Sequence, residues 1–191
     1  MVNASSENEM LAVNGMSCYA RDGRNANSAL VVNVRPEDFD HGILGGMEFQ
    51  RKYERLAFRL GGGDGKAPVQ LAKDFIDDVP TGEIGGVSPT VTSGFKLAEL
   101  KNCLPQFVTD TLRSGLCDFE RRMKGFAGGG AVLTGIESRT SAPGRILRGE
   151  NMQSINASGI YPSGEGAGYA GGIVSAAVDG IRAAISLIDN D

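Results

Sequence analysis

The fold expected at the C-terminal end of the chain is decided by Gly159-Ile-Tyr-Pro-Ser-Gly-Glu-Gly-Ala-Gly-Tyr-Ala-Gly-Gly-Ile173. This stretch predicts a short buried strand, then a glycine-dense turn that holds one carboxylate, Glu165, and then the start of an apolar helix. The first N–H groups of a helix have no partner within the helix, so they and its positive end are open to a ligand. Glycines also let a flat ligand approach the backbone closely. The stretch therefore indicates a site for a nucleotide-like ligand.

The residues after the turn have the spacing of a helix with one apolar ridge. The ridge consists of Ile173, Ala177, Ile181, Ala184 and Ile188. Asp179 and Arg182 lie off this ridge, and we expect them to pair weakly in solvent. An alternative is that the glycines only let a strand reverse into a helix. Between Gly164 and Gly172 every residue except Glu165 and Tyr169 is glycine or alanine, which favours a ligand site over a simple reversal.

A longer form of the same segment is Tyr161-Pro-Ser-Gly-Glu-Gly-Ala-Gly-Tyr-Ala-Gly-Gly-Ile-Val-Ser-Ala-Ala-Val-Asp-Gly-Ile181. It resembles the C-terminal flavin-contacting motif of the bacterial uncharacterised FAD-dependent dehydrogenases, which are distant relatives of the glutathione-reductase-like flavoproteins. Three further stretches, in the family's order, extend the resemblance along nearly the whole chain. They are Asn14-Gly-Met-Ser-Cys-Tyr-Ala-Arg-Asp-Gly23 with Asn25-Ala-Asn-Ser-Ala-Leu30, Gly61-Gly-Gly-Asp-Gly-Lys-Ala-Pro-Val-Gln70, and Gly135-Ile-Glu-Ser-Arg-Thr-Ser-Ala-Pro143.

The resemblance implies an oxidoreductase whose FAD accepts and passes on a hydride or electrons. Glu165, with Gly164 and Gly166 beside it, would accept hydrogen bonds from ribityl or ribose hydroxyls. The backbone of Gly171, Gly172 and Ile173 would face the pyrimidine edge of the flavin and stabilise negative charge there in the reduced form.

The resemblance also places Arg139 and Thr140 on the flavin or substrate side, and with them Asn14 and Ser17. A salt bridge from Arg139 to Glu137 or Glu150 is an equal alternative. No catalytic acid or base and no substrate is indicated by the residues.

One motif of such flavoproteins has no counterpart in this sequence. The Gly-x-Gly-x-x-Gly turn that holds the FAD pyrophosphate does not occur between a strand and a helix, and the glycine clusters at 61–65 and 128–130 lack the required spacing. We therefore expect the chain to be the C-terminal portion of a larger flavoprotein. Alone it would bind FAD weakly or not at all and be inactive. The competing class is a non-enzymatic binding or assembly module in which the glycine-rich turn is architectural.

The rest of the sequence predicts an α+β fold in which strand-bearing ends flank a helical middle at about 41–125. Strands are predicted at 11–13, 29–34 and 131–136. Helices are predicted at 43–60, from Pro68, at 95–103, and from Pro105 to Gly125. The resemblance implies a substrate-side, inserted domain at 1–158 and a returning segment of the FAD-binding domain at 159–191. We expect the last helix to bury its ridge against the helical middle or a second copy of the chain.

Composition limits the partners and the compartment. The net charge is −4 without a basic stripe, which disfavours nucleic acid. No apolar run approaches the roughly 18 residues of a membrane span, and no signal sequence is evident, so no membrane association is expected. Cys18, Cys103 and Cys117 form no Cys-x-x-Cys pair, and His41 is the single histidine, so no disulfide framework or metal site is predicted. Reduced thiols indicate a cytoplasmic protein.

Overall fold

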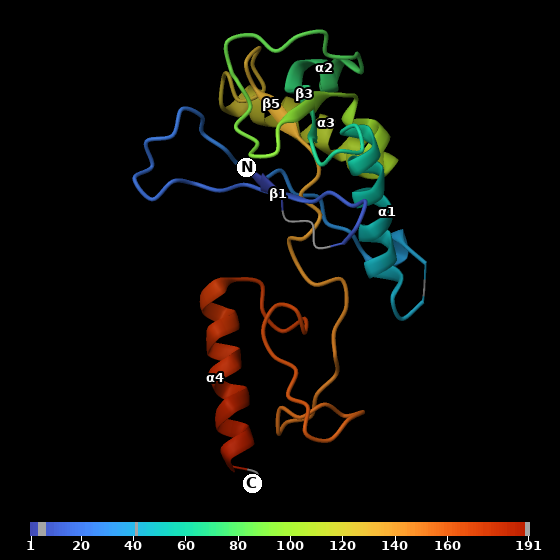
Figure 1. The fold of residues 1–191 in the computed structure, drawn as a ribbon, viewed down its shortest axis with the longest axis vertical. Coiled ribbons are helices and arrows are strands. Elements are labelled where there is room, and N and C mark those ends of the chain that lie inside the picture. Colours follow the sequence, from blue (N-terminus) through green and yellow to red (C-terminus); the bar gives the residue numbers. More distant parts are fainter. Residues whose placement is uncertain (4–6, 41, 190–191) are drawn as a thin grey trace. The chain divides into compact units, whose positions relative to one another are not determined.

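The structure is a computed structural model that describes residues 1–3, 7–40 and 42–189. His41, for which the sequence predicted no metal role, lies outside the described residues. The chain forms two compact units: Met1–Arg35 with Arg51–Ser138, and Pro36–Gln50 with Arg139–Asp191 (Figure 1). Both helices and strands are present, so the α+β prediction is confirmed. The assignment of 1–158 and 159–191 to functional domains stays a prediction.

The first unit contains a three-stranded sheet with β3 (Ala67–Leu71) at its centre. β4 (Phe95–Leu97) pairs with β3 in parallel and β5 (Val132–Thr134) pairs with it antiparallel, so that Val69 lies opposite both Leu97 and Thr134. The helix predicted from Pro68 is wrong, because Pro68 lies inside β3. Proline has no N–H to donate, but Pro68 lies at the end of the β3–β5 ladder, where this N–H is not needed. Its carbonyl still accepts a hydrogen bond from Gly135 N–H at 3.0 Å.

Three helices accompany this sheet. α2 (Ala72–Asp77) follows β3 directly, and α3 (Gln106–Arg122) begins after Pro105, whose fixed φ suits a helix entrance. α1 (Gly45–Leu60) ends at Gly61, after which Gly62 and Gly63 adopt positive φ and donate N–H groups to carbonyls of the last turn. The predictions of helices at 43–60 and after Pro105 are confirmed.

The helix predicted at 95–103 is wrong, because that stretch divides between β4 and the 3-10 helix η2 (Leu100–Cys103). A buried side chain of β3 explains the division. Gln70 accepts a hydrogen bond from the N–H of Leu100 at 2.9 Å and donates one to the carbonyl of Val79 at 2.8 Å. These bonds hold the chain after β4 against the sheet, and a continuous helix would break them.

The core of the first unit joins the sheet to the helices. Its buried members are Leu11, Val13, Ala57, Ala67, Ala72, Phe75, Leu100, Cys103, Leu116, Ala127 and Ile136. Burial raises the pKa of the Cys103 thiol to about 12, so this cysteine stays protonated and serves as a core residue.

The N-terminal part of the first unit is only partly regular. β1 (Val2–Asn3) pairs antiparallel with β2 (Val13–Asn14), which overlaps the strand predicted at 11–13. The strand predicted at 29–34 is wrong: no strand of the described residues pairs with this stretch, and Val31 and Val34 are exposed. Their apolar side chains misled the prediction, because β-branched residues indicate a strand only where a neighbour covers one face. A 3-10 helix, η1 (Pro36–Asp38), begins the second unit.

The second unit is built around α4 (Ile173–Asp189), drawn in red in Figure 1, and the irregular segment before it. The helix prediction is confirmed, but the short strand expected from Gly159 does not form. The backbone there is partnered in other ways: Ile160 accepts a hydrogen bond from Ser154 N–H at 2.8 Å, and Pro162 accepts one from the Arg148 guanidinium at 2.7 Å. Among the described residues, no helix is both long and apolar enough to cross a membrane.

Removal of a core ring tests the packing of the first unit. Phe75 is 1% exposed, so Phe75→Ala leaves a cavity under α2 and is expected to lower the free energy of unfolding by about 3–5 kcal/mol. Phe95→Ala is the matched control, because the Phe95 ring on β4 is 37% exposed. This change should lower the free energy of unfolding by about 1 kcal/mol. Urea denaturation followed by circular dichroism measures both. Equal losses in the two variants would contradict the assignment of the core.

Candidate functional site

The start of α4 carries backbone donors without acceptors. Gly172 precedes the helix and has no side chain to cap it, while Ser175 donates its hydroxyl to the Gly172 carbonyl at 2.9 Å. The first main-chain bond of the helix runs from Ala176 N–H to the same carbonyl, also at 2.9 Å. Within the part of the chain that the structure describes, the N–H groups of Ile173, Val174 and Ser175 have no acceptor. They are directed out of the positive end of the helix and can receive an anion or a carbonyl oxygen.

A tight turn lies before the helix, and we call residues 164–168 the glycine turn. Gly168 N–H donates to the Glu165 carbonyl at 2.9 Å, and Tyr169 N–H donates to the Gly164 carbonyl at 3.0 Å. Gly168 has φ +84°, and a Cβ there would lie 2.6 Å from the carbonyl oxygen of Gly144. Only glycine satisfies both constraints. The side chain of Glu165 is exposed, and among the described residues its carboxylate has no partner.

A buried ion pair joins the glycine turn to α4. Arg148 binds Asp179 with both terminal nitrogens, at 2.9 and 2.7 Å, and the two side chains are 10% and 12% exposed. Asp179 also accepts a hydrogen bond from Gly164 N–H at 2.9 Å. The expectation that Asp179 pairs weakly with Arg182 in solvent is therefore wrong. Asp179 faces the irregular segment, where a bidentate guanidinium offers a stronger, buried partner.

Tyr169 packs on this ion pair. Its ring centroid lies 3.6 Å from the guanidinium carbon of Arg148 and 4.9 Å from that of Arg145. Its hydroxyl donates to the carbonyl of Ile146 at 3.1 Å and accepts from the N–H of Arg148 at 3.1 Å. Arg145 in turn donates to the Gly168 carbonyl at 2.9 Å. The aromatic ring and two arginines thus hold the end of the glycine turn in place.

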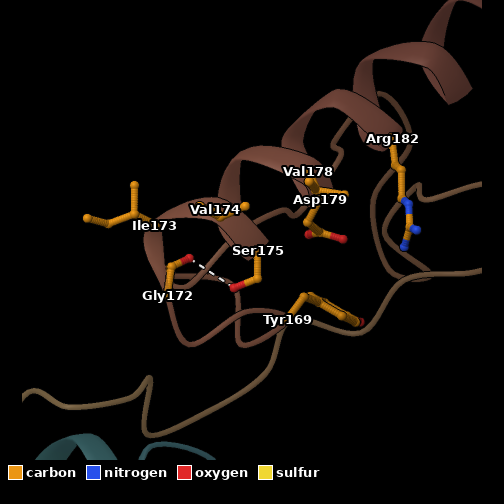
Figure 2. A pocket seen from close by; sticks show the side chains of 8 residues that line it. All are labelled: Tyr169, Gly172, Ile173, Val174, Ser175, Val178, Asp179 and Arg182. Atoms are coloured by element: carbon orange, nitrogen blue, oxygen red, sulfur yellow. Dashed lines mark hydrogen bonds between the residues drawn. The ribbon is translucent and has the colours of Figure 1, made fainter.

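An open cavity of about 730 Å³ borders the start of α4 (Figure 2). Its lining residues are Tyr169, Gly172, Ile173, Val174, Ser175, Val178, Asp179 and Arg182. The volume lies in the range of small-molecule and cofactor sites. The lining combines apolar valines, an aromatic ring, a guanidinium and helix N–H donors, which suits a flat ligand that carries polar or anionic groups.

The predicted site residues fall into four places, two of them beside the cavity or in the turn before it. Gly164, Glu165 and Gly166 lie in the glycine turn, while Gly171, Gly172 and Ile173 lie at the start of α4. Of these, Gly172 and Ile173 line the cavity.

Four further predicted residues lie outside the cavity. Arg139 and Thr140 are exposed at the beginning of the irregular segment, and Arg139 interacts with another group of the protein. Asn14 ends β2 and Ser17 follows it, both in the first unit.

Sequence reasoning missed Arg148, Tyr169 and Asp179. Asp179 was the available signal, because a carboxylate within a strongly apolar helix is seldom buried without a partner. The partner itself could not be found from the sequence, since Arg148 lies in an irregular segment far along the chain.

The side of α4 that faces away from the buried Asp179 and Ala183 is apolar and exposed, and at the start of the helix it adjoins the cavity. Its residues are Ile173, Val174, Ala177, Val178, Ile181, Ala184, Ile185 and Ile188. Ile173 is 91% exposed and Ile188 is 74% exposed, so the predicted apolar ridge exists but is uncovered. Continuous apolar surface of this kind is typical of a contact face.

The Arg148–Asp179 pair gives a testable pH dependence. The Arg148 guanidinium, followed by Gly164 N–H, lowers the pKa of Asp179 from 3.8 to about 2. Because the folded pKa is depressed, the stabilisation is complete above the unfolded pKa and is lost as pH falls through about 2. We expect Asp179→Asn to lower the free energy of unfolding by about 2 kcal/mol at pH 6, and by progressively less between about pH 4 and pH 2.

Urea denaturation followed by α-helical circular dichroism measures this difference, and a ¹³C NMR titration of the carboxyl gives the pKa directly. A carboxyl that titrates near 3.8, or a stability difference independent of pH, would contradict the buried pair.

Comparison with known proteins places the chain in a family. Residues 1–140 match the family described as FAD-dependent protein, C-terminal domain-like. An uncharacterized protein of Clostridium beijerinckii is 55% identical over 190 residues, which are 99% of this chain and 36% of that protein. The chain thus spans about a third of the length of this curated relative. The match covers well over half of the sequence, and the chain belongs to the FAD-dependent protein, C-terminal domain-like family.

Proposed function

We propose that the chain is the C-terminal, flavin-contacting part of an FAD-dependent oxidoreductase of the dehydrogenase type. The observation that carries the proposal is the set of N–H groups of Ile173, Val174 and Ser175 that find no acceptor among the described residues and lie beside an open cavity. Such donors at a helix start favour a ligand that is negatively charged or becomes so. Membership of an FAD-dependent family makes a flavin the best-supported ligand.

The residues present fit this cofactor. The exposed carboxylate of Glu165, between Gly164 and Gly166, can accept hydrogen bonds from ribityl or ribose hydroxyls. The backbone of Gly171, Gly172 and Ile173 can face the pyrimidine edge and stabilise its negative charge after reduction. FAD, when bound, would supply the hydride or electron transfer.

Arg139 and Thr140 are proposed on the flavin or substrate side. Both side chains are exposed and so can reach a bound molecule.

The proposal assigns the pyrophosphate contacts of FAD to a part of the enzyme that this chain does not supply. The sequence has no Gly-x-Gly-x-x-Gly turn between a strand and a helix, and the relative is much longer than the matched region. The isolated chain should therefore bind FAD weakly or not at all and be inactive. We also propose a cytoplasmic location, because three cysteines without a Cys-x-x-Cys pair favour reduced thiols.

A chimera tests the flavin assignment. The matched third of the Clostridium beijerinckii protein is replaced by this chain, and the relative, the chimera and the isolated chain are titrated with FAD. We expect the relative and the chimera to quench flavin fluorescence and to gain thermal stability, and the isolated chain to do neither or to do so only weakly. Glu165→Ala in the chimera should weaken FAD about tenfold, because it removes a charged acceptor from the hydroxyls.

Glu83→Ala, at an exposed glutamate of the first unit, is the matched control and should leave the affinity unchanged. Absence of FAD from both the relative and the chimera would overturn the proposal.

The exposed face of α4 supports a second candidate, assembly of two copies through this helix. The face is continuous and uncharged, whereas Asp179 and Ala183 on the opposite side are buried. Burial of such a face against its own copy would remove apolar area from water at about 25 cal/mol per Å². In this alternative the glycine turn serves only to position the helix.

Light scattering coupled to gel filtration tests the assembly. The wild-type chain should elute as a dimer at micromolar concentration, and Ile181→Lys should make it a monomer, because Ile181 is 61% exposed at the centre of the face. Lys73→Ala, at an exposed side chain of α2, is the control and should leave the dimer intact. A wild-type chain that stays monomeric at high concentration would contradict this candidate.

A further inference from the structure

We propose that Arg148 and Asp179 are positioning residues that fix the glycine turn against α4 and so set where Glu165 stands relative to the N–H groups at the helix start. For the flavin itself the inference rests on the proposed function. The evidence is the way in which this one ion pair binds both ends of the turn.

Asp179 holds the first residue of the turn. It lies in the second turn of α4, and its Oδ2 accepts from both Gly164 N–H and Arg148 Nη1, each at 2.9 Å. Its Oδ1 accepts from Arg148 Nη2 at 2.7 Å. Because the carboxylate belongs to the helix, the backbone of Gly164 is tied directly to α4.

Arg148 holds the chain on both sides of the turn. Its Nη1 donates to the carbonyl of Pro162 at 2.7 Å, just before the turn. Its guanidinium stacks on the ring of Tyr169 at 3.6 Å, just after the turn. Arg148 is needed for its shape as well as its charge, since an ammonium cannot make two parallel bonds and stack at the same time.

Asp179 borders the cavity, but the hydrogen bonds of the pair are made within the protein. Both side chains are nearly buried, at 10% and 12% exposure, and the two terminal nitrogens of Arg148 and the two carboxylate oxygens of Asp179 bind one another and the backbone. Glu165 has the opposite character, because it is exposed and unpartnered among the described residues. Its place therefore depends on the backbone of the turn, and the ion pair fixes that backbone. A pre-formed turn avoids the cost of ordering it when the ligand binds.

Amide hydrogen exchange measured by NMR on the 191-residue chain tests the positioning role. Asp179→Asn and Arg148→Lys should raise the exchange rates of Gly164 and Tyr169 about tenfold or more, the size expected when a buried bond to a charged group is lost. Rates at Val69 in β3 should not change. Asp77→Asn, which breaks the exposed pair with Lys73, is the matched control and should leave the turn unaffected.

The chimera with the Clostridium beijerinckii protein provides the flavin readout. There Asp179→Asn should raise the Kd for FAD about tenfold while Asp77→Asn leaves it unchanged. Unchanged exchange at Gly164 and Tyr169 would overturn the inference. So would an equal rise along all of α4, or an unchanged Kd in a chimera that binds FAD. If the wild-type chimera takes up no FAD, the proposed function fails, and the exchange rates alone decide whether the pair fixes the turn.

Discussion

Asp179 imposes the constraint on which the second unit depends. A carboxylate in an apolar helix cannot be buried without compensation, and here Arg148 and Gly164 N–H provide it. The need to satisfy one charge therefore brings Arg148, 31 positions away, against α4 and the glycine turn that precedes it. The same contacts leave the N–H groups at the helix start facing the cavity, so the structural pair and the proposed ligand site are parts of one arrangement.

The first unit is organised differently. It has a conventional core around β3, α2 and α3, with Glu54, Gln70 and Thr109 as buried polar residues that hydrogen-bond to backbone or side chains of the unit. The second unit has one long helix, an irregular segment and a continuous exposed apolar face. The difference suits the proposed division of labour: a stable domain carries a smaller part whose surfaces are shaped for contact with a cofactor and with other protein.

The sequence predicted the long helices well, because their apolar residues recur at helical spacing. The apolar spacing of 43–60, the stretch after Pro105 and the ridge from Ile173 each led to a helix of the observed extent. The failures come from longer-range effects. Pro68 indicated the start of a helix, but pairing with β4 and β5 makes its stretch the central strand. The apolar residues of 29–34 indicated a strand, but no strand of the described residues pairs with them.

The candidate site shows the same limit. The glycine turn and the helix start were visible in the sequence, because glycine density and helix spacing are local signals. The Arg148–Asp179 pair spans 31 positions, and nothing local distinguishes Arg148 from the neighbouring arginine. The side chains that hold the site together could therefore not be predicted from the sequence. The glycine turn and the helix start, whose backbone groups would contact the proposed ligand, could be.

A crystal structure of the chimera grown with FAD would show whether the start of α4 holds the flavin. We expect backbone nitrogens among Gly171, Gly172, Ile173, Val174 and Ser175 to lie within hydrogen-bond distance, about 3 Å, of the flavin. We also expect the Glu165 carboxylate to contact hydroxyls of the same molecule. A flavin bound elsewhere, with the start of α4 facing solvent or another protein surface, would contradict the account.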